Sequence, residues 1–489
     1  MSSRTSHPMP CSSLLLAPCS LLLFATSIGA QAAFDRSKPP VLPKPAELTV
    51  PAVKTASLPN GIKLNVVEHR ELPLVHVILV VGGGARLDTE RPGLASFTAN
   101  MLDEGAGSRN ALELQSAVAY LGASLNTLSD WDRIGVSLKV PVRNLEAALD
   151  LMADVVLRPR FDAAEVARQR GLRLTGILQR KDQPTTLAQL AFNMSLYPAG
   201  HPYHNPLGGD SATTAKLDSA MVRGFYSATI RPSRTTIYAV GDISAEQLRA
   251  SLAKRFGAWR EEPGAGVART NVAPVTVPPG RRIVLVDKPN AAQSIIVIGA
   301  PGVERKSPDY AALAVMNTIL GGLFTSRLNF NLRETKGYTY GAGSRYDFRL
   351  APGPFTASAQ VRTNVTDSSL VEFFKELRAI RDSVVTDEEL AKAKATLELG
   401  IPDELETTSQ IVQEMATLGM FGLTLEEKRD FARKVRAVTK ADVQRVARQY
   451  VPEDRVLITV VGDLSKVRAG IDALKLGPAT VLEVSQVVR

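Results

Sequence analysis

The chain is poor in cysteine: its 489 residues include two, Cys11 and Cys19. Both lie near the N-terminus, inside a segment that has the features of a signal peptide. The remaining chain therefore contains no disulfide, no thiol nucleophile and no cysteine ligand for a metal. These absences exclude a disulfide framework, a cysteine protease and a cysteine-ligated zinc site for the mature protein.

Strong charge and long apolar runs are also missing. After the N-terminal segment, no stretch reaches the ~18 uninterrupted apolar residues of a membrane span. The formal net charge is +9, from 58 basic and 49 acidic residues that are spread along the chain. A slight basic excess is typical of a solvated surface, although it also attracts acidic peptides, anionic membranes or nucleic acid. Because no zinc-finger or RNA-binding signature is present, we expect no nucleic-acid partner and no stable membrane span after signal cleavage.

The N-terminus itself has the pattern of a secretory signal. Arg4 supplies a weak basic start, a mostly apolar stretch runs over residues 14–30, and Ala30-Gln31-Ala32 offers a small-x-small cleavage site. Pro18 within the apolar stretch argues against the alternative of a membrane anchor. A lipoprotein interpretation of Cys19 is weak because the apolar run resumes after it. We therefore predict a signal peptide over 1–32, cleavage near Ala32, and a periplasmic or otherwise exported protein.

Segments rich in proline or glycine, which interrupt regular secondary structure, divide the rest of the chain. Residues 33–53 are rich in Pro, Lys and Ala and are interpreted as an extended lead-in, and residues 261–280 contain two Pro/Gly clusters typical of a linker. This predicts an N-terminal lobe over 54–260 and a C-terminal lobe over 281–489.

The two lobes repeat one another in order and spacing. The segment Thr236–Ser244, a strand followed by Gly-Asp and a Ser-capped helix, recurs as Leu457–Ser465. Two further pairs match, a helix start and an apolar strand: Phe161–Glu165 with Val385–Glu389, and Val77–Val81 with Ser294–Ile298. A duplicated fold explains such matches. The order of strands and helices in each half predicts an α+β class, with helices packed on a mostly antiparallel sheet.

A glycine-rich strand end in the first half leads into a helical segment. Gly82–Arg86 is followed by Arg91–Gly105, which reads RPGLASFTANMLDEG. This arrangement resembles the pitrilysin and mitochondrial-processing-peptidase family, the inverzincins, whose corresponding helix carries H-x-x-E-H. In active members the two histidines bind zinc and the glutamate activates the bound water, while a glutamate from a later helix is the third ligand.

The residues that carry this chemistry are replaced here. Matched residue by residue, the first His position is Ser96, the Glu position Ala99, the second His position Asn100, and the third-ligand position Gly176. Ser, Ala and Gly are not competent zinc ligands, an Asn amide is a poor one, and Ala99 cannot act as a general base. The resemblance therefore implies a degenerate site, with no catalytic residue, metal or cofactor of this chain's own.

Two histidines offer the remaining metal-site hypothesis. His201 and His204 have i, i+3 spacing, but Gly200 and two prolines make the segment a loop. It resembles a family loop that usually reads Gly-His-Pro-Tyr-Gly, and packing is the favoured interpretation of the pair.

The second half keeps a different family segment. Leu320–Leu328 reads LGGLFTSRL and leads into Leu332–Gly341, LRETKGYTYG. In the family, an Arg and a Tyr seven positions later hydrogen-bond the substrate backbone beside the scissile bond, and Arg333 and Tyr340 fit that spacing. Tyr338 is the alternative tyrosine. From the residues alone, the competing interpretation is an arginine paired with Glu334 or with a helix C-terminus, together with a core tyrosine.

The resemblance covers nearly the whole mature chain and implies a division of labour. In some family members one subunit carries zinc and H-x-x-E-H, while its homologue lacks them and supplies the Arg/Tyr pair. The expectation is a non-catalytic, substrate-binding subunit, inactive alone, of a heteromeric zinc metalloendopeptidase, with zinc in an H-x-x-E-H partner and peptides as substrates. A peptide-binding or scaffold protein without a proteolytic role is the alternative. An enzyme active by itself would need the His201/His204 site.

Overall fold

A computed structural model describes residues 48–88, 90–261, 272 and 274–489. The predicted signal peptide, most of the predicted lead-in and much of the predicted linker lie outside these residues. Within the described chain, two six-stranded sheets organise the N-terminal and C-terminal lobes.

The N-terminal sheet has the strand order β1-β2-β6-β3-β5-β4. Only the β2–β6 pair is parallel. Its strands are β1 (Lys54–Ser57), β2 (Lys63–Glu68), β3 (Leu74–Gly82), β4 (Ser124–Ser129), β5 (Arg133–Pro141) and β6 (Thr235–Gly241). The lobe's helices are α1 (Leu94–Met101), α2 (Ala111–Tyr120), α3 (Leu145–Leu157), α4 (Ala163–Gln179), α5 (Pro184–Leu196), α6 (Ser211–Thr214), α7 (Ser219–Thr229) and α8 (Ala245–Phe256).

The C-terminal sheet has the order β12-β7-β11-β8-β10-β9, with β7 parallel to both β11 and β12. Its strands are β7 (Arg282–Asp287), β8 (Gln293–Pro301), β9 (Thr339–Tyr346), β10 (Pro354–Arg362), β11 (Leu457–Gly462) and β12 (Ala479–Leu482). The helices are α9 (Tyr310–Asn317), α10 (Arg327–Asn329), α11 (Thr366–Asp382), α12 (Asp387–Leu399), α13 (Thr408–Met420), α14 (Glu426–Ala437), α15 (Lys440–Tyr450), α16 (Leu464–Ala473) and α17 (Val484–Val487), with the π-helical turns η6 (Thr318–Gly322) and η7 (Phe330–Thr335).

The repeat found in the sequence is a repeat of topology. β6 and β11 occupy the same place in their sheets, and β3 and β8 do likewise. α4 and α12 each begin at the third residue of the matched helix-start segments. The predicted α+β class with mostly antiparallel sheets is confirmed. The predicted serine cap holds for Ser244, whose side chain accepts from Gln247 N. It is wrong for the second copy, where Asp463 is the N-cap of α16 and Ser465 Oγ donates to its carboxylate.

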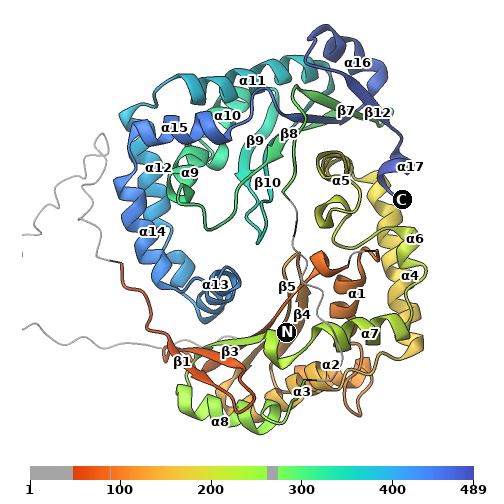
Figure 1. The fold of residues 1–489 in the computed structure, drawn as a ribbon, viewed down its shortest axis with the longest axis vertical. Coiled ribbons are helices and arrows are strands. Elements are labelled where there is room, and N and C mark those ends of the chain that lie inside the picture. Colours follow the sequence, from red (N-terminus) through yellow and green to blue (C-terminus); the bar gives the residue numbers. More distant parts are fainter. Residues whose placement is uncertain (1–47, 89, 262–271, 273) are drawn as a thin grey trace, which may run out of the picture. The chain divides into compact units, whose positions relative to one another are not determined.

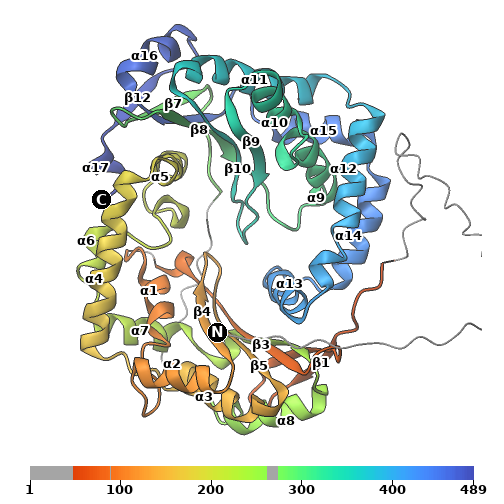
Figure 2. The ribbon, with the colours of Figure 1, turned by 180° about the vertical axis from the view of Figure 1, so that it is seen from behind.

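Both sheets are buried on two faces, and the apolar strands show why. In β3, Val77 and Leu79 face the core beneath the lobe's own helices, while Ile78 and Val80 face the opposite side. A strand that is apolar at every position needs cover on both faces. The second cover comes from the other half of the chain: α13 packs on β3 and β6, and α5 packs on β7, β8 and β11 (Figures 1 and 2).

A second connection between the halves is made by the loop after β9. Arg349, which is 7% exposed, lies over the rings of Trp131 and Tyr203, 4.7 and 4.2 Å from their centroids. Next to it, Leu350 N donates to the carboxylate of Asp132 at 3.0 Å. Cation–π contacts of a desolvated guanidinium are among the stronger polar contacts in proteins. Together with the exchanged helices, this loop joins the two halves of the described chain.

One helical run, Tyr310–Thr335, is long and apolar enough to cross a membrane by length and composition. Most of it is buried in the core of the C-terminal lobe: 61% of its most apolar window is covered by protein. The run includes α9, η6, α10 and η7, whose apolar side chains pack in the core of that lobe.

His76 makes the contact between β3 and α13 sensitive to pH. Its ring nitrogens lie 2.8 Å from Ser137 Oγ and 3.2 Å from Ser409 Oγ of α13. Burial, with a smaller contribution from neighbouring Lys139, lowers the pKa of His76 from 6.5 to about 4. The unfolded chain then binds a proton that the folded chain does not, so stability is lost as the pH falls from 6.5 towards 4. We expect the Tm measured across this window to fall less steeply in His76→Gln than in the wild type. Parallel Tm curves for the two proteins would contradict this assignment.

Candidate functional site

Helix α1 carries three of the four positions singled out from the sequence. Its first turn is fixed by Asp88, whose carboxylate accepts from Gly93 N at 2.8 Å and Ala95 N at 2.7 Å. Burial raises the pKa of Asp88 to about 7, while these two N–H donors and the charge of Arg173 favour its ionised form. The start of α1 is therefore held in place by a buried carboxyl group.

The α1 residues matched to the family's zinc motif are approached here by a guanidinium. Arg173, from α4, donates through Nη1 to Ser96 Oγ at 2.9 Å and to Gly93 O at 3.0 Å. With the Asn100 amide oriented by its hydrogen-bonding partners, its Oδ1 accepts from Arg173 Nη2 at 3.1 Å and its Nδ2 donates to Ser96 O at 3.1 Å. The guanidinium also lies over Phe97, 4.9 Å from the ring centroid.

The environment of Arg173 keeps it charged and enclosed. Burial lowers its pKa to about 10, helped by the like charge of Arg180 and opposed by Asp88. At neutral pH the side chain is thus a cation, and it joins Ser96 and Asn100 of α1 to α4. Ser96 also approaches the loop before α6, with its Oγ 2.9 Å from Leu207 O.

The residues at this place do not fit zinc. Ser96 and Asn100 present a hydroxyl and an amide that are already engaged by a positive charge, and Ala99 is fully buried in the core of the N-terminal lobe. A cation would be repelled by Arg173, and neither ligand atom suits zinc. Among the residues that the structure describes, no group of three or more His, Cys, Asp and Glu could hold a metal ion.

Gly176 lies one helical turn beyond Arg173 and is exposed. A Cβ built at this glycine would meet no heavy atom within 4 Å. The α4 side chain that reaches Ser96 and Asn100 is therefore that of Arg173, and the match of Gly176 to the third-ligand position stays a prediction. The signal that sequence reasoning passed over was a basic residue one turn before the predicted ligand position, on the same helical face.

The His201–His204 loop is built by packing. His201 stacks on Tyr197, with ring centroids 4.7 Å apart, and its Nδ1 accepts from Tyr203 N. His204 Nδ1 lies 2.8 Å from Tyr197 O. Both imidazoles thus have protein partners, as the packing interpretation expects.

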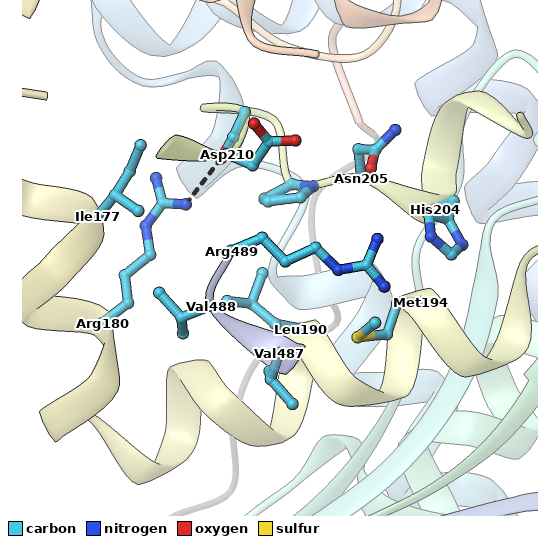
Figure 3. A pocket seen from close by; sticks show the side chains of 12 residues that line it. Ile177, Arg180, Leu190, Met194, His204, Asn205, Asp210, Val487, Val488 and Arg489 are labelled. Carbon is cyan, nitrogen blue, oxygen red and sulfur yellow. Dashed lines mark hydrogen bonds between the residues drawn. The ribbon is translucent and has the colours of Figure 1, made fainter. Parts of the chain in front are cut away.

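Beside this loop, a cavity of about 30 Å³ lies between α4, α5 and the C-terminal residues (Figure 3). Arg180, which follows the last residue of α4, points into it and donates through Nη1 to Gly209 O at 3.1 Å. A volume of this size holds roughly two waters. The cavity is thus too small for a peptide side chain.

The second family segment presents its two predicted residues at the surface. Arg333, on η7, has a side chain that is 36% exposed; its Nε lies 3.3 Å from Glu334 Oε1, and its guanidinium lies over Phe324, 4.3 Å from the centroid. Tyr340, on β9, is 87% exposed, whereas Tyr338 packs against the core of the lobe. Arg333 does form the ion pair with Glu334 that the competing interpretation expects, but this ion pair leaves the Arg333 side chain accessible. Of the two tyrosines, Tyr340 is the accessible one.

Comparisons with known proteins identify the family to which the fold and these segments belong. Residues 66–207 match the model of insulinase (peptidase family M16), and residues 216–397 match that of the peptidase M16 inactive domain. An uncharacterized zinc protease of Mycobacterium bovis is 28% identical over 413 residues, covering 82% of this chain and 91% of the relative. A probable mitochondrial-processing peptidase subunit beta of Arabidopsis thaliana is 22% identical over 440 residues, covering 85% and 80%.

Solved structures share the fold. A peptidase M16 inactive domain from Pseudomonas fluorescens superposes with a TM-score of 0.78 at 28% identity, covering 84% of this chain and 98% of that one. A protease from Helicobacter pylori gives the same TM-score at 19% identity, covering 84% and 100%. The two models describe the same family, and together they span more than half of the chain. The chain belongs to peptidase family M16, the insulinase and pitrilysin family, and lacks that family's zinc-binding motif.

Proposed function

We propose that this chain is the non-catalytic, substrate-binding subunit of an exported, periplasmic zinc metallopeptidase. A homologous subunit with H-x-x-E-H supplies the zinc and the general base. This chain binds extended peptides and positions their backbone through Arg333 and Tyr340.

The observation that carries the proposal is the contrast between the two lobes. In the N-terminal lobe, the guanidinium of Arg173 is bonded to Ser96 and Asn100, the residues matched to the family's zinc-binding histidines. In the C-terminal lobe, Arg333 and the accessible Tyr340 keep the family spacing. A guanidinium and a phenol both donate hydrogen bonds, and donors of this kind stabilise a peptide carbonyl that gains negative charge as it reacts.

An edge strand supports the idea of an extended peptide. β3, which ends in the glycine-rich segment, cannot accept a peptide strand because it lies between β5 and β6. The edge strand β4 contacts α1, which carries Ser96 and Asn100. Edge strands present unpaired backbone groups to which an extended peptide can add.

A peptide-binding or scaffold protein without a proteolytic partner is the competing function. It accounts equally well for the replaced zinc site and for the edge strand. It gives no reason for Arg333 and Tyr340 to remain together at the surface.

The test is reconstitution. The mature chain is purified alone and together with a co-expressed H-x-x-E-H homologue, and zinc content and cleavage of a quenched fluorescent peptide are measured. We expect no cleavage by the isolated chain, and cleavage by the pair at a rate at least about tenfold above that of the homologue alone, since transition-state hydrogen bonds contribute factors of this size or more.

The outcomes separate the alternatives. Cleavage by the isolated chain would show that it is an enzyme by itself. Full activity of the homologue without this chain would favour the scaffold function.

A further inference from the structure

A glycine-rich turn, residues 321–326, precedes α10. A pocket of about 170 Å³ opens between this turn and helix α12. Leu323, Thr318 and Ile319 provide its apolar part, Arg327 and Glu389 one wall, and Phe330 and Lys392 are exposed at its lining. This volume exceeds that of a few waters and suits a single side chain of intermediate length. The pocket is separate from the contacts of Arg173 in the other lobe.

The polar groups of this pocket are mostly donors. Ser326 is 3% exposed, and its Oγ has no hydrogen-bond partner among the described residues. Such a buried hydroxyl is costly unless something bonds it. Lys392 is exposed and makes no ion pair with any described residue. Both groups would bond an acceptor that enters the pocket.

The single acidic group of the pocket is already engaged. Glu389 accepts from Arg327 Nε at 2.6 Å and Nη2 at 2.9 Å, and also from Thr386 N at 2.8 Å. With Glu389 paired to Arg327, the charge of Lys392 is the uncompensated one. The lining is therefore short of one negatively charged acceptor.

The pocket adjoins the residues assigned to peptide binding. Phe330 of the pocket and Arg333 lie on the same turn, η7. Phe324, on which the Arg333 guanidinium stacks, belongs to the same glycine-rich turn as Leu323 and Ser326. A peptide held at Arg333 would thus have a neighbouring side chain within reach of this pocket.

We propose that the pocket between the glycine-rich turn and α12 is a subsite for an acidic side chain, glutamate above all, of the bound peptide. Its carboxylate accepts from Ser326 Oγ and Lys392 Nζ while its methylenes contact Leu323 and Ile319. This inference rests on the proposed function and adds the substrate class, peptides with a glutamate near the site held by Arg333.

The experiment uses the mature chain without a partner and twelve-residue fluorescein-labelled peptides of alanine and serine. A single glutamate, or a matched glutamine, is placed at each position in turn, and binding is measured by fluorescence anisotropy. We expect one glutamate position to bind about tenfold more tightly than its glutamine counterpart, as for one charge-assisted hydrogen-bonded contact. Lys392→Glu should abolish or reverse this preference, and Ser326→Ala should reduce it about threefold.

Lys216→Glu, the same charge change at an exposed residue of the N-terminal lobe, is the control and should retain the preference. Equal binding of glutamate and glutamine peptides at every position, unchanged by Lys392→Glu, would overturn the subsite and leave the proposed function standing. Absence of binding by every peptide, to wild type and Arg333→Ala alike, would instead overturn the proposed function and the subsite with it.

Discussion

An Arg333→Ala variant of this chain, mixed with the zinc-bearing partner that we propose for it, is expected to cleave peptides with kcat/KM reduced by about 10²–10³-fold. The guanidinium is accessible at 36% exposure, and its contacts with Glu334 and Phe324 hold it without enclosing it. The hydrogen bond that we propose it donates to the peptide carbonyl would strengthen as that oxygen gains charge, so the loss should fall on kcat more than on KM. Quenched-peptide kinetics at several substrate concentrations separate the two constants.

The tyrosines supply the matched control. Tyr340→Phe removes only the hydroxyl of an 87% exposed side chain and should cost about tenfold in kcat, the lower end for one neutral donor. Tyr338→Phe changes a side chain that packs against the core and should leave kcat unaltered. A loss of kcat in Tyr338→Phe with none in Tyr340→Phe would reverse the assignment. Unchanged kcat in Arg333→Ala would remove the central support of the proposed function.

The fold was predictable because its signals are periodic and repeated. The matched strands around Val77–Val81 and Ser294–Ile298 indicate two similar sheets. Their mostly apolar residues are buried on both faces of each sheet. Which helix covers the second face of each sheet was not predictable. The amphipathic pattern of α5 or α13 says that one side is buried, but it does not say that the burying sheet belongs to the other half of the chain.

The sequence predicted which zinc-binding groups are missing, but it did not predict that Arg173 would contact the residues at their positions. Matching Ser96, Ala99 and Asn100 to a motif identifies which chemical groups are missing. What occupies the place depends on which α4 residue points at α1, and a shift of one helical turn separates Gly176 from Arg173. One sequence does not show which side chain makes this contact, whereas the hydrogen bonds in the structure show that it is Arg173.

Arg173→Ala is expected to lower the free energy of unfolding by about 3 kcal/mol, because it removes the shared partner of several buried groups. The substitution takes bonds from Ser96, Asn100 and Gly93 at once, and it leaves the buried carboxyl of Asp88 without its nearby positive charge. Arg173→Lys keeps a charge but not the planar fork that reaches two side chains, so it should recover less than half of the loss. Urea denaturation followed by circular dichroism measures these differences.

Arg168→Ala on the same helix is the control. Arg168 forms ion pairs with Glu165 and Glu104, but its side chain is 47% exposed, so the expected loss is below about 1 kcal/mol. If Arg173→Ala were no more destabilising than Arg168→Ala, the guanidinium would not join α1 to α4. The zinc content of Arg173→Ala is a second readout and should stay at background, because Ser96 and Asn100 remain poor ligands once the charge is gone. Stable zinc binding by that variant would show that Arg173 alone excludes the metal. The ligands would then still be competent, contrary to our inference that they have been lost.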